Sequence, residues 1–413
     1  MKEIKRDVYL NKLISRKENG LIKVITGIRR CGKSYLLDPL FKNHLLESNV
    51  KEDHIIKIEL DKEENKKYRD SHELNEYIKS QIKDKNMYYI LLDEIQMVEG
   101  FESVLNSFLY GRNLDVYVTG SNSKFLSSDI ITEFRGRGDE IKVFPLSFSE
   151  YMESFKGDKQ DAWNEYVLYG GLPLILSKKT DEEKSKYLKD LFDQTYIKDI
   201  IERNNIQRVD ILDSIINILA SSVGSLTNPK KIYDTFVSNG EKEISSNTVN
   251  SYIKYIEDSF IVNKSDRYDV KGKKYIQTPQ KYYFSDIGLR NARLNFRQQE
   301  ENHIMENIIY NELLLRGYNV DVGVVELREG NQRKQLEVDF VCNLGNKRYY
   351  VQSALNLDTR EKTIQEERPL MNINDNFKKI IVVKDNMKHW MTEEGILVIG
   401  IQEFLLNKNS LDL

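Results

Sequence analysis

The chain has 413 residues, enough for about three domains of ordinary size, and its 40% hydrophobic residues can fill more than one core. Its 62 basic and 65 acidic residues leave a net charge of −3, which excludes attraction to nucleic acid or membrane through overall charge. The polar start Met1–Asp7 and the lack of a long apolar run argue against a signal peptide and a membrane span, so we expect a cytoplasmic protein. Cys31 and Cys342 alone exclude a disulfide framework or a thiolate zinc cluster.

A phosphate-binding loop is predicted near the start of the chain. The β-prone run Leu21–Thr26 leads into Gly27-Ile28-Arg29-Arg30-Cys31-Gly32-Lys33-Ser34, and apolar residues at helical spacing follow. In a G-x-x-x-x-G-K-S loop, backbone N–H groups surround phosphate oxygens, the lysine (Lys33) reaches the β- and γ-phosphates, and the serine hydroxyl (Ser34) ligates Mg²⁺. The predicted ligands are therefore ATP and Mg²⁺. The nucleotide-binding residues are predicted to be Gly27, Arg29, Arg30, Cys31, Gly32, Lys33, Ser34 and Tyr35.

An acidic pair is predicted to complete this site. The apolar run Met87–Leu92 is typical of a strand buried on both faces of a parallel sheet, and it ends in Asp93 and Glu94, a Walker B arrangement. We expect this strand beside the phosphate loop. Asp93 would then hold Mg²⁺, and Glu94 would orient and deprotonate the attacking water. A solvated strand end is the alternative.

The next strand is predicted to carry γ-phosphate sensors. The run Val116–Thr119 stops at Gly120-Ser121-Asn122-Ser123, which places small polar side chains at another strand end. Ser121 and Asn122 are the candidates. A turn without ligand contact is the alternative.

An arginine finger is predicted in the Gly-rich loop before the short strand Glu140–Val143. Arg135 and Arg137 lie in this loop, and an arginine there can stabilise the charge of a transferring phosphoryl group in its own subunit or a neighbouring one. We favour Arg137, with Arg135 second. A loop with solvated charges is the alternative.

These motifs occur in the order typical of one protein family. Besides the phosphate loop, the strings that match are Leu91-Leu92-Asp93-Glu94-Ile95-Gln96, Thr119-Gly120-Ser121-Asn122-Ser123, Arg135-Gly136-Arg137, Phe144-Pro145-Leu146-Ser147-Phe148-Ser149-Glu150-Tyr151, Tyr169-Gly170-Gly171-Leu172-Pro173 and Tyr196-Ile197-Lys198-Asp199-Ile200-Ile201-Glu202-Arg203. The chain resembles the prokaryotic AAA-type ATPases that carry a C-terminal domain of unknown function. The resemblance covers nearly the whole chain.

The resemblance implies an α/β fold with four parts. These are a P-loop NTPase core with a parallel sheet at residues 1–145, a helical lid at 146–205, a winged-helix domain at 206–295 and an α/β restriction-endonuclease-like domain at 296–413.

Helical periodicity dominates the predicted winged helix. Apolar faces occur from Asp210 to Val223 and from Val249 to Phe260, with a short helix at Lys230–Phe236 between them. The last helix presents Asn250, Ser251 and Lys254 on its other face, and Arg267, Lys271, Lys273 and Lys274 would lie on a wing. Double-stranded DNA is therefore one candidate partner. Because that helix also carries Glu257 and Asp258, packing against a subunit or another domain is the alternative.

The last part is predicted to have lost nuclease chemistry. Glu306, on an amphipathic helix at Ile304–Leu315, and Asp339, on a strand at Leu336–Val341, match two of the positions at which restriction-like nucleases hold Mg²⁺. The third motif fails, because Gln352-Ser353-Ala354 stands where an acid-x-lysine is needed. We expect Glu306 and Asp339 to be structural remnants.

The sequence thus predicts a Mg²⁺-dependent ATPase in which nucleotide state moves a winged-helix and nuclease-like half, with DNA as one possible substrate. The alternative is a nucleotide-gated switch or scaffold for a protein partner, with slow turnover and no nucleic acid. Whether the chain forms a homo-oligomer is left open, since a finger acting between subunits requires one.

Overall fold

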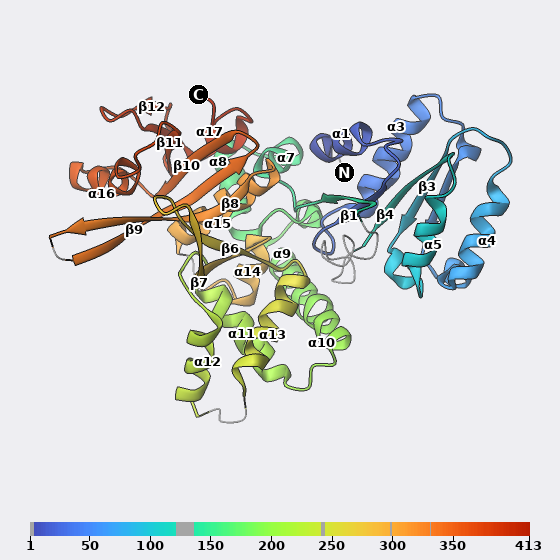
Figure 1. The fold of residues 1–413 in the computed structure, drawn as a ribbon, viewed down its shortest axis with the longest axis horizontal. Coiled ribbons are helices and arrows are strands. Elements are labelled where there is room, and N and C mark those ends of the chain that lie inside the picture. The colour runs from blue at the N-terminus through green and yellow to red at the C-terminus, as the bar shows by residue number, and fades with distance from the viewer. Residues whose placement is uncertain (1–3, 121–135, 241–243, 298–299, 331) are drawn as a thin grey trace. The chain divides into compact units, whose positions relative to one another are not determined.

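The computed structural model describes residues 4–120, 136–240, 244–297, 300–330 and 332–413 (Figure 1). The chain divides into two compact units, one of Met1–Pro145 with Asp258–Phe260 and one of Leu146–Glu257 with Ile261–Leu413. Within the described ranges, none of the helices combines the length and the apolar composition that crossing a membrane requires.

The first unit is built on a five-stranded sheet in the order β2-β3-β4-β1-β5, in which all neighbouring strands are parallel. Its strands are β1 (Ile22–Thr26), β2 (Ile55–Glu59), β3 (Tyr88–Asp93), β4 (Leu114–Thr119) and β5 (Gly138–Lys142). The predicted parallel α/β core is confirmed. Strand β4 returns between β1 and β3 and pairs with both, so the acidic strand is separated from the strand before the phosphate loop by one strand.

Helices pack against this sheet, which explains why its strand β3 is a continuous apolar run up to Asp93. Every residue of β3 is buried, and the α4 and α5 residues Leu74 and Leu105 belong to the same core cluster as Ile90 and Leu92. The helical segments of this unit are α1 (Asp7–Ser15), α2 (Lys33–Tyr35), η1 (Leu36–Phe41), α3 (Lys42–Glu47), η2 (Glu52–His54), η3 (Glu63–Arg69), α4 (Ser71–Gln81), η4 (Ile95–Met97) and α5 (Phe101–Phe108).

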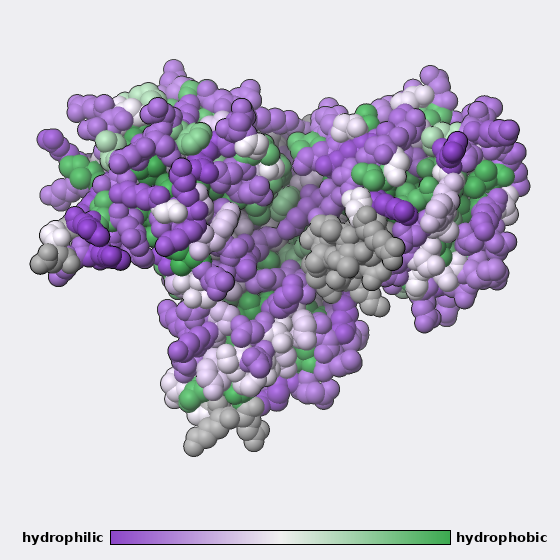
Figure 2. Space-filling view, in the orientation of Figure 1, coloured by the Kyte–Doolittle hydropathy of each residue, from purple (hydrophilic) through white to green (hydrophobic). Residues whose placement is uncertain are grey.

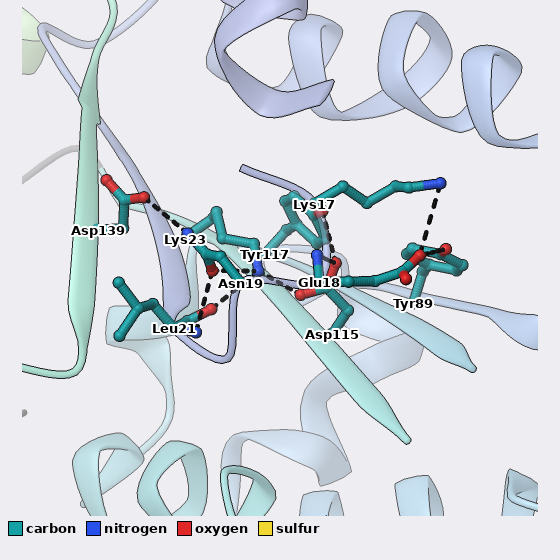
Figure 3. A network of polar contacts seen from close by, with 9 residues as sticks. All are labelled: Lys17, Glu18, Asn19, Leu21, Lys23, Tyr89, Asp115, Tyr117 and Asp139. Atoms are coloured by element: carbon teal, nitrogen blue, oxygen red, sulfur yellow. Dashed lines mark hydrogen bonds and ion pairs between the residues drawn. The ribbon is translucent and has the colours of Figure 1, made fainter. Parts of the chain in front are cut away.

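A buried polar network closes the amino end of this sheet (Figure 3). The Lys23 ammonium of β1 pairs with the Asp115 carboxylate of β4, and neither side chain is more than 3% exposed. Asp115 also accepts hydrogen bonds from the Tyr117 hydroxyl at 2.7 Å and the Glu18 amide at 2.9 Å. The network therefore connects the chain before β1 to strands β1 and β4.

In the first part of the second unit, two of the sequence strings that match the family have a structural explanation. In the string Phe144–Tyr151, Ser147 and Glu150 form a reciprocal capping box at the start of α7. In Tyr169–Pro173, a Cβ on Gly171 would lie 2.2 Å from the Leu146 carbonyl oxygen, so only glycine fits. The helical segments up to the hairpin are α7 (Phe148–Ser154), α8 (Lys159–Tyr169), η6 (Pro173–Ser177), α9 (Asp181–Leu191), η7 (Phe192–Ile197), α10 (Lys198–Asn204), α11 (Val209–Ser221), α12 (Pro229–Ser238) and α13 (Ser246–Asp258).

A mixed eight-stranded sheet forms the rest of the second unit, in the order β12-β13-β11-β10-β9-β8-β6-β7. Its strands are β6 (Val262–Asp269), β7 (Lys274–Phe284), β8 (Asn319–Glu329), β9 (Gln332–Leu344), β10 (Lys347–Ala354), β11 (Lys378–Val383), β12 (Trp390–Met391) and β13 (Leu397–Gly400). The accompanying helices are α14 (Ile287–Arg293), α15 (Glu301–Leu315), α16 (Arg360–Met371) and α17 (Ile401–Leu406).

The hairpin that follows α13 belongs to this large sheet. Helices α11, α12 and α13 and the hairpin β6–β7 occur in the predicted order. However, β6 pairs in parallel with β8, with Arg267, Tyr268 and Asp269 opposite Val322, Gly323 and Val324. The predicted boundary at residues 295 and 296 therefore falls between strands of one continuous sheet.

Candidate nucleotide-binding site

The phosphate loop follows β1 directly, and its backbone requires glycine. Gly27 has φ 138° and Gly32 has φ 101°, and a Cβ on Gly27 would lie 2.1 Å from the Val143 carbonyl oxygen. The Lys33 side chain folds back over the loop, where its Nζ donates to the carbonyl oxygens of Gly27 at 3.0 Å and Ile28 at 3.1 Å. Lys33 is buried, whereas Ser34 is exposed at the start of α2. The loop thus presents a lysine and a hydroxyl at the carboxyl end of the sheet.

The other predicted contacts within the loop differ in exposure. Arg30 is exposed and has φ 66°, Arg29 is half-buried, and Tyr35 is 37% exposed. Cys31 is buried, with its Sγ 3.4 Å from the Val143 carbonyl oxygen, so this thiol anchors the loop to the chain after β5. A nucleotide could contact Cys31 only through its backbone.

Asp93 and Ser34 come together at the ends of β3 and the loop. Burial raises the pKa of Asp93, while hydrogen bonds from the Thr119 and Ser34 hydroxyls act in the opposite direction. The Thr119 Oγ1 donates to Asp93 Oδ1 and accepts the Glu94 amide hydrogen at 3.0 Å. Thr119 closes β4, the strand between β1 and β3, and sequence reasoning treated it only as a strand residue. A threonine directly before the small polar turn was the signal.

Glu94 has a restrained backbone and a side-chain partner. Its φ of 55° and ψ of 48° lie in the left-handed region, which is uncommon for a residue other than glycine. The Gln96 side-chain amide donates to Glu94 Oε2. Gln96 was within a family string but had no assigned role. It holds the carboxylate that the sequence predicts to be the base.

The carboxylate and hydroxyl oxygens of this site suit Mg²⁺ that is bound together with phosphate and water, and not a metal ion enclosed by protein ligands alone. In the described part of the chain, no three His, Cys, Asp or Glu side chains are grouped to hold a metal ion. Mg²⁺ is commonly bound through one or two carboxylates together with substrate phosphates and water. Ser34 and Asp93 supply such a partial set of oxygen ligands.

The predicted sensors and finger are only partly described. Ser121, Asn122 and Arg135 lie outside the described residues. Arg137 is exposed, and its carbonyl oxygen accepts the Ile22 amide hydrogen at 2.9 Å, which places its backbone at the amino end of β1. The loop leaves the carboxyl end of that strand, about 15 Å away at ~3.3 Å per residue. Arg137 therefore cannot reach the phosphate loop of its own sheet.

Two family models match parts of this chain. Residues 19–152 match the family model of an AAA domain, and residues 160–300 match a domain of unknown function, DUF8612. An uncharacterized protein of Haemophilus influenzae is 34% identical over 411 residues, covering 98% of each chain. The chain belongs to the same family as this Haemophilus influenzae protein. A second similar protein, an uncharacterized protein of Methanocaldococcus jannaschii, is 29% identical over 377 residues, which cover 87% of this chain and 79% of that protein.

The fold of this chain is similar to that of a solved ATPase structure. A Walker-type ATPase of Pyrococcus abyssi superposes with a TM-score of 0.51 and 16% identity, covering 71% of this chain and 96% of that one. The likeness is one of fold. The phosphate loop and the acidic pair lie within the range that matches the AAA domain, so this unit has the fold of AAA-type ATPases.

The second unit contains a cluster of carboxylates around one ammonium group. Lys281 Nζ, from β7, lies 2.8 Å from Glu306 Oε1, 2.7 Å from Glu337 Oε1 and 3.6 Å from Asp339 Oδ1. Lys281 is 3% exposed. Burial lowers its pKa, but the three carboxylates together raise it above the ordinary value.

Lys281 compensates part of the negative charge of these carboxylates. Burial and the Glu306 carboxylate raise the pKa of Asp339 to about 8. The Ser353 amide donates to Asp339 Oδ2 at 2.8 Å, and Gln352 donates to Glu366 at 3.2 Å. Glu306 and Asp339 are therefore held in a network of protein hydrogen bonds and one ammonium ion.

Proposed function

We propose that this protein is a Mg²⁺-dependent ATP hydrolase whose nucleotide state moves its C-terminal half. The observation that carries the proposal is the convergence of Lys33, Ser34 and Asp93 at the carboxyl end of a parallel sheet, with Thr119 joining Asp93 to Glu94. Lys33 would bind the β- and γ-phosphates, and Ser34 and Asp93 would hold Mg²⁺. The metal would neutralise charge that develops on the transferring phosphoryl group.

Glu94 would act as the general base. It follows the metal-holding Asp93 by one residue, so it adjoins the place where the γ-phosphate would lie. The Gln96 amide would fix the direction of its carboxylate, because a base must lie within hydrogen-bond reach of the water it deprotonates. Ser121 and Asn122 remain the proposed γ-phosphate sensors.

Arg137 would serve the active site of a neighbouring subunit. Its backbone lies at the amino end of β1, so the finger role requires a homo-oligomer in which this end of one sheet meets the phosphate loop of the next. Arg135 stays the second candidate for the same role.

The C-terminal half would bind double-stranded DNA through α13 and the β6–β7 turn. Support comes from the exposed side chains of Asn250, Ser251 and Lys254 on α13 and from the exposed Lys271, Lys273 and Lys274 beside the turn. None of these six side chains is acidic.

A second candidate function is a nucleotide-gated switch or scaffold for a protein partner, without nucleic acid. It is favoured by the Lys281 cluster, in which an ammonium ion lies among the carboxylates that the sequence predicts to be remnants of a nuclease site, and by the net charge of −3. Slow ATP turnover would then set the lifetime of one state.

Steady-state ATP hydrolysis with and without duplex DNA separates these functions. We would compare the wild-type chain with Lys33→Ala and Glu94→Gln, using Arg112→Ala, an exposed arginine before β4, as the control. Activity that disappears in both site variants but not in the control supports the hydrolase, and acceleration by DNA supports the DNA-bound form. Hydrolysis absent in all four proteins would overturn it in favour of the switch.

A further inference from the structure

A basic groove lies between the β6–β7 turn and the β8–β9 hairpin. Its volume is about 400 Å³. The residues that line it are Asp269, Lys271, Gly272, Glu326, Leu327, Arg328 and Arg333. All of them belong to the second unit, and the groove is distinct from the outward face of α13.

Two arginines face each other across the hairpin. Arg328 of β8 lies directly opposite Arg333 of β9 in the antiparallel ladder, so both side chains leave the same face of the sheet. Both are exposed, and no ion pair joins either of them to a residue that the structure describes. Like charges directly opposite each other destabilise a sheet, so this pair favours an anion between the two guanidinium groups.

A lysine of the turn also lines the groove. Asp269 lies opposite Val324, and counting along β8 by two residues gives Glu326 and then Arg328. Lys271 follows Asp269 by two residues, and its Nζ donates to the Glu326 carbonyl oxygen at 3.0 Å. That bond holds the Lys271 ammonium group beside Glu326, two residues before Arg328 on β8.

The acids in the groove have partners of their own. Asp269 Oδ1 accepts the Gly272 amide hydrogen at 2.8 Å, and Glu326 Oε1 accepts from the Gln335 side-chain amide at 3.4 Å. The buried Arg267 donates from Nη2 to Gln335 Oε1 at 3.1 Å, and its Nε has no hydrogen-bond acceptor in the described part of the chain. Both carboxylates keep their charge in these bonds, so the lining sets three cations (Lys271, Arg328 and Arg333) against two carboxylates and has one excess positive charge.

Further cations flank the groove. Lys273 and Lys274 on the turn and Lys334 on the hairpin are all exposed. Figure 2 shows strongly hydrophilic side chains gathered over the end of the β8–β9 hairpin. The turn and the hairpin therefore carry exposed lysines in addition to the three cations that line the groove.

We infer that this groove binds the phosphodiester backbone of duplex DNA, with Arg328 and Arg333 holding one phosphate and Lys271 an adjacent one. The inference deepens the proposed DNA contact and rests on it. Guanidinium groups match phosphate oxygens in geometry and charge, and a two-stranded ribbon fits the width of a major groove. These contacts go to phosphate, so they position the duplex without reading its sequence.

The test is the salt dependence of duplex binding by the full chain, measured by fluorescence anisotropy with one AT-rich and one GC-rich duplex. The variants are Arg328→Ala/Arg333→Ala and Arg328→Lys/Arg333→Lys. The matched control is Arg360→Ala/Lys388→Ala, which removes two exposed cations of the same unit outside the groove. Inorganic tripolyphosphate is the competitor that detects a small-anion site. ATP hydrolysis without DNA checks that each variant is folded.

The alanine pair should weaken both duplexes equally, by at least about ten-fold, and should lower the slope of log K against log salt by about one to two units. The lysine pair should restore most of the slope, and the control should behave as wild type. Unchanged binding by the alanine pair, with binding weakened by Lys273→Ala/Lys274→Ala, would overturn the inference and leave the DNA proposal. No salt-dependent binding by the wild type would overturn both. Tripolyphosphate that displaces DNA at equal phosphate concentration would assign the groove to small anions and overturn the backbone contact.

Discussion

The Thr119 hydroxyl donates a hydrogen bond to the Asp93 carboxylate, and the same oxygen accepts the amide hydrogen of Glu94. One buried side chain therefore positions both acidic residues of the candidate site. Because Thr119 lies on the strand between β1 and β3, the relationship depends on the order of strands in the sheet.

Replacing Thr119 with valine should impair the site without touching nucleotide. Asp93 would lose a hydrogen bond that opposes the rise of its pKa, and the Glu94 amide would lose its acceptor. We expect ATP hydrolysis and Mg²⁺ affinity to fall about 10- to 100-fold, as for other groups that orient a metal ligand. Titration of activity with Mg²⁺ measures both effects. Thr119→Ser keeps the hydroxyl and should retain most activity, and an equal loss in both variants would contradict the role.

Mixing two inactive variants should restore hydrolysis if Arg137 acts between subunits. Lys33→Ala spoils the loop of its own subunit, and Arg137→Ala spoils a neighbouring site. In a randomly mixed oligomer, about a quarter of the sites would combine an intact loop with an intact finger. The measurement is the ATPase rate of the mixture against each variant alone. A mixture as inactive as its components would argue against a finger at Arg137.

Asp115→Asn should destabilise the first unit strongly. The substitution leaves the Lys23 ammonium, which is fully buried, without its carboxylate. Breaking such a pair costs about 3–5 kcal/mol of unfolding free energy. Urea denaturation measures the loss. Asp139→Asn at the same sheet end removes a partly exposed carboxylate that pairs with Arg16, and it should cost about 1 kcal/mol or less.

The pH dependence of stability should carry a signature of Asp286. Burial raises its pKa from 3.8 to about 6, although the Gly171 and Leu289 amides donate to it. The folded protein therefore holds this proton more tightly than the unfolded chain does. Its contribution to stability is present below about pH 4 and is lost as the pH rises through about 6, by about 3 kcal/mol at most.

Asp286→Asn removes that titration. The free energy of unfolding of the variant, measured by urea denaturation from pH 4.5 to 7.5, should fall less with rising pH than that of the wild type. The lost acceptor adds a constant offset. Asp385→Asn, at an exposed site, should keep the wild-type slope. A slope equal to wild type in Asp286→Asn would contradict the assignment.

Local sequence predicted the first unit well because its signals are local. Continuous apolar runs mark β1 and β3, and the spacing of Gly27, Gly32 and Lys33 marks the loop. Strand β2 at Ile55–Glu59 was not predicted, although apolar and charged residues alternate over its last residues. The role of Thr119 and the distance of Arg137 from the loop could not be predicted, because both depend on β4 lying between β1 and β3 and on β5 pairing with β1.

The second unit was harder for a related reason. The helices α11–α13 and the strands β9 and β10 follow from periodicity, and Glu306 and Asp339 do lie together. The Lys281 ammonium among them was not predicted, since β7 is brought there only by the tertiary fold. Arg267 pairs with Val322 although β7, α14 and α15 lie between them in the chain, so no local sequence pattern indicates this pairing.

That pairing gives the second unit an indivisible architecture. If the chain were cut between β7 and α15, β6 and β8 would each expose a row of unpaired N–H and C=O groups. Such open edges invite pairing with other molecules, so either fragment would tend to aggregate or to exchange strands with a copy of itself. Gene rearrangements that shuffle domains could therefore move residues 261–413 only as one piece.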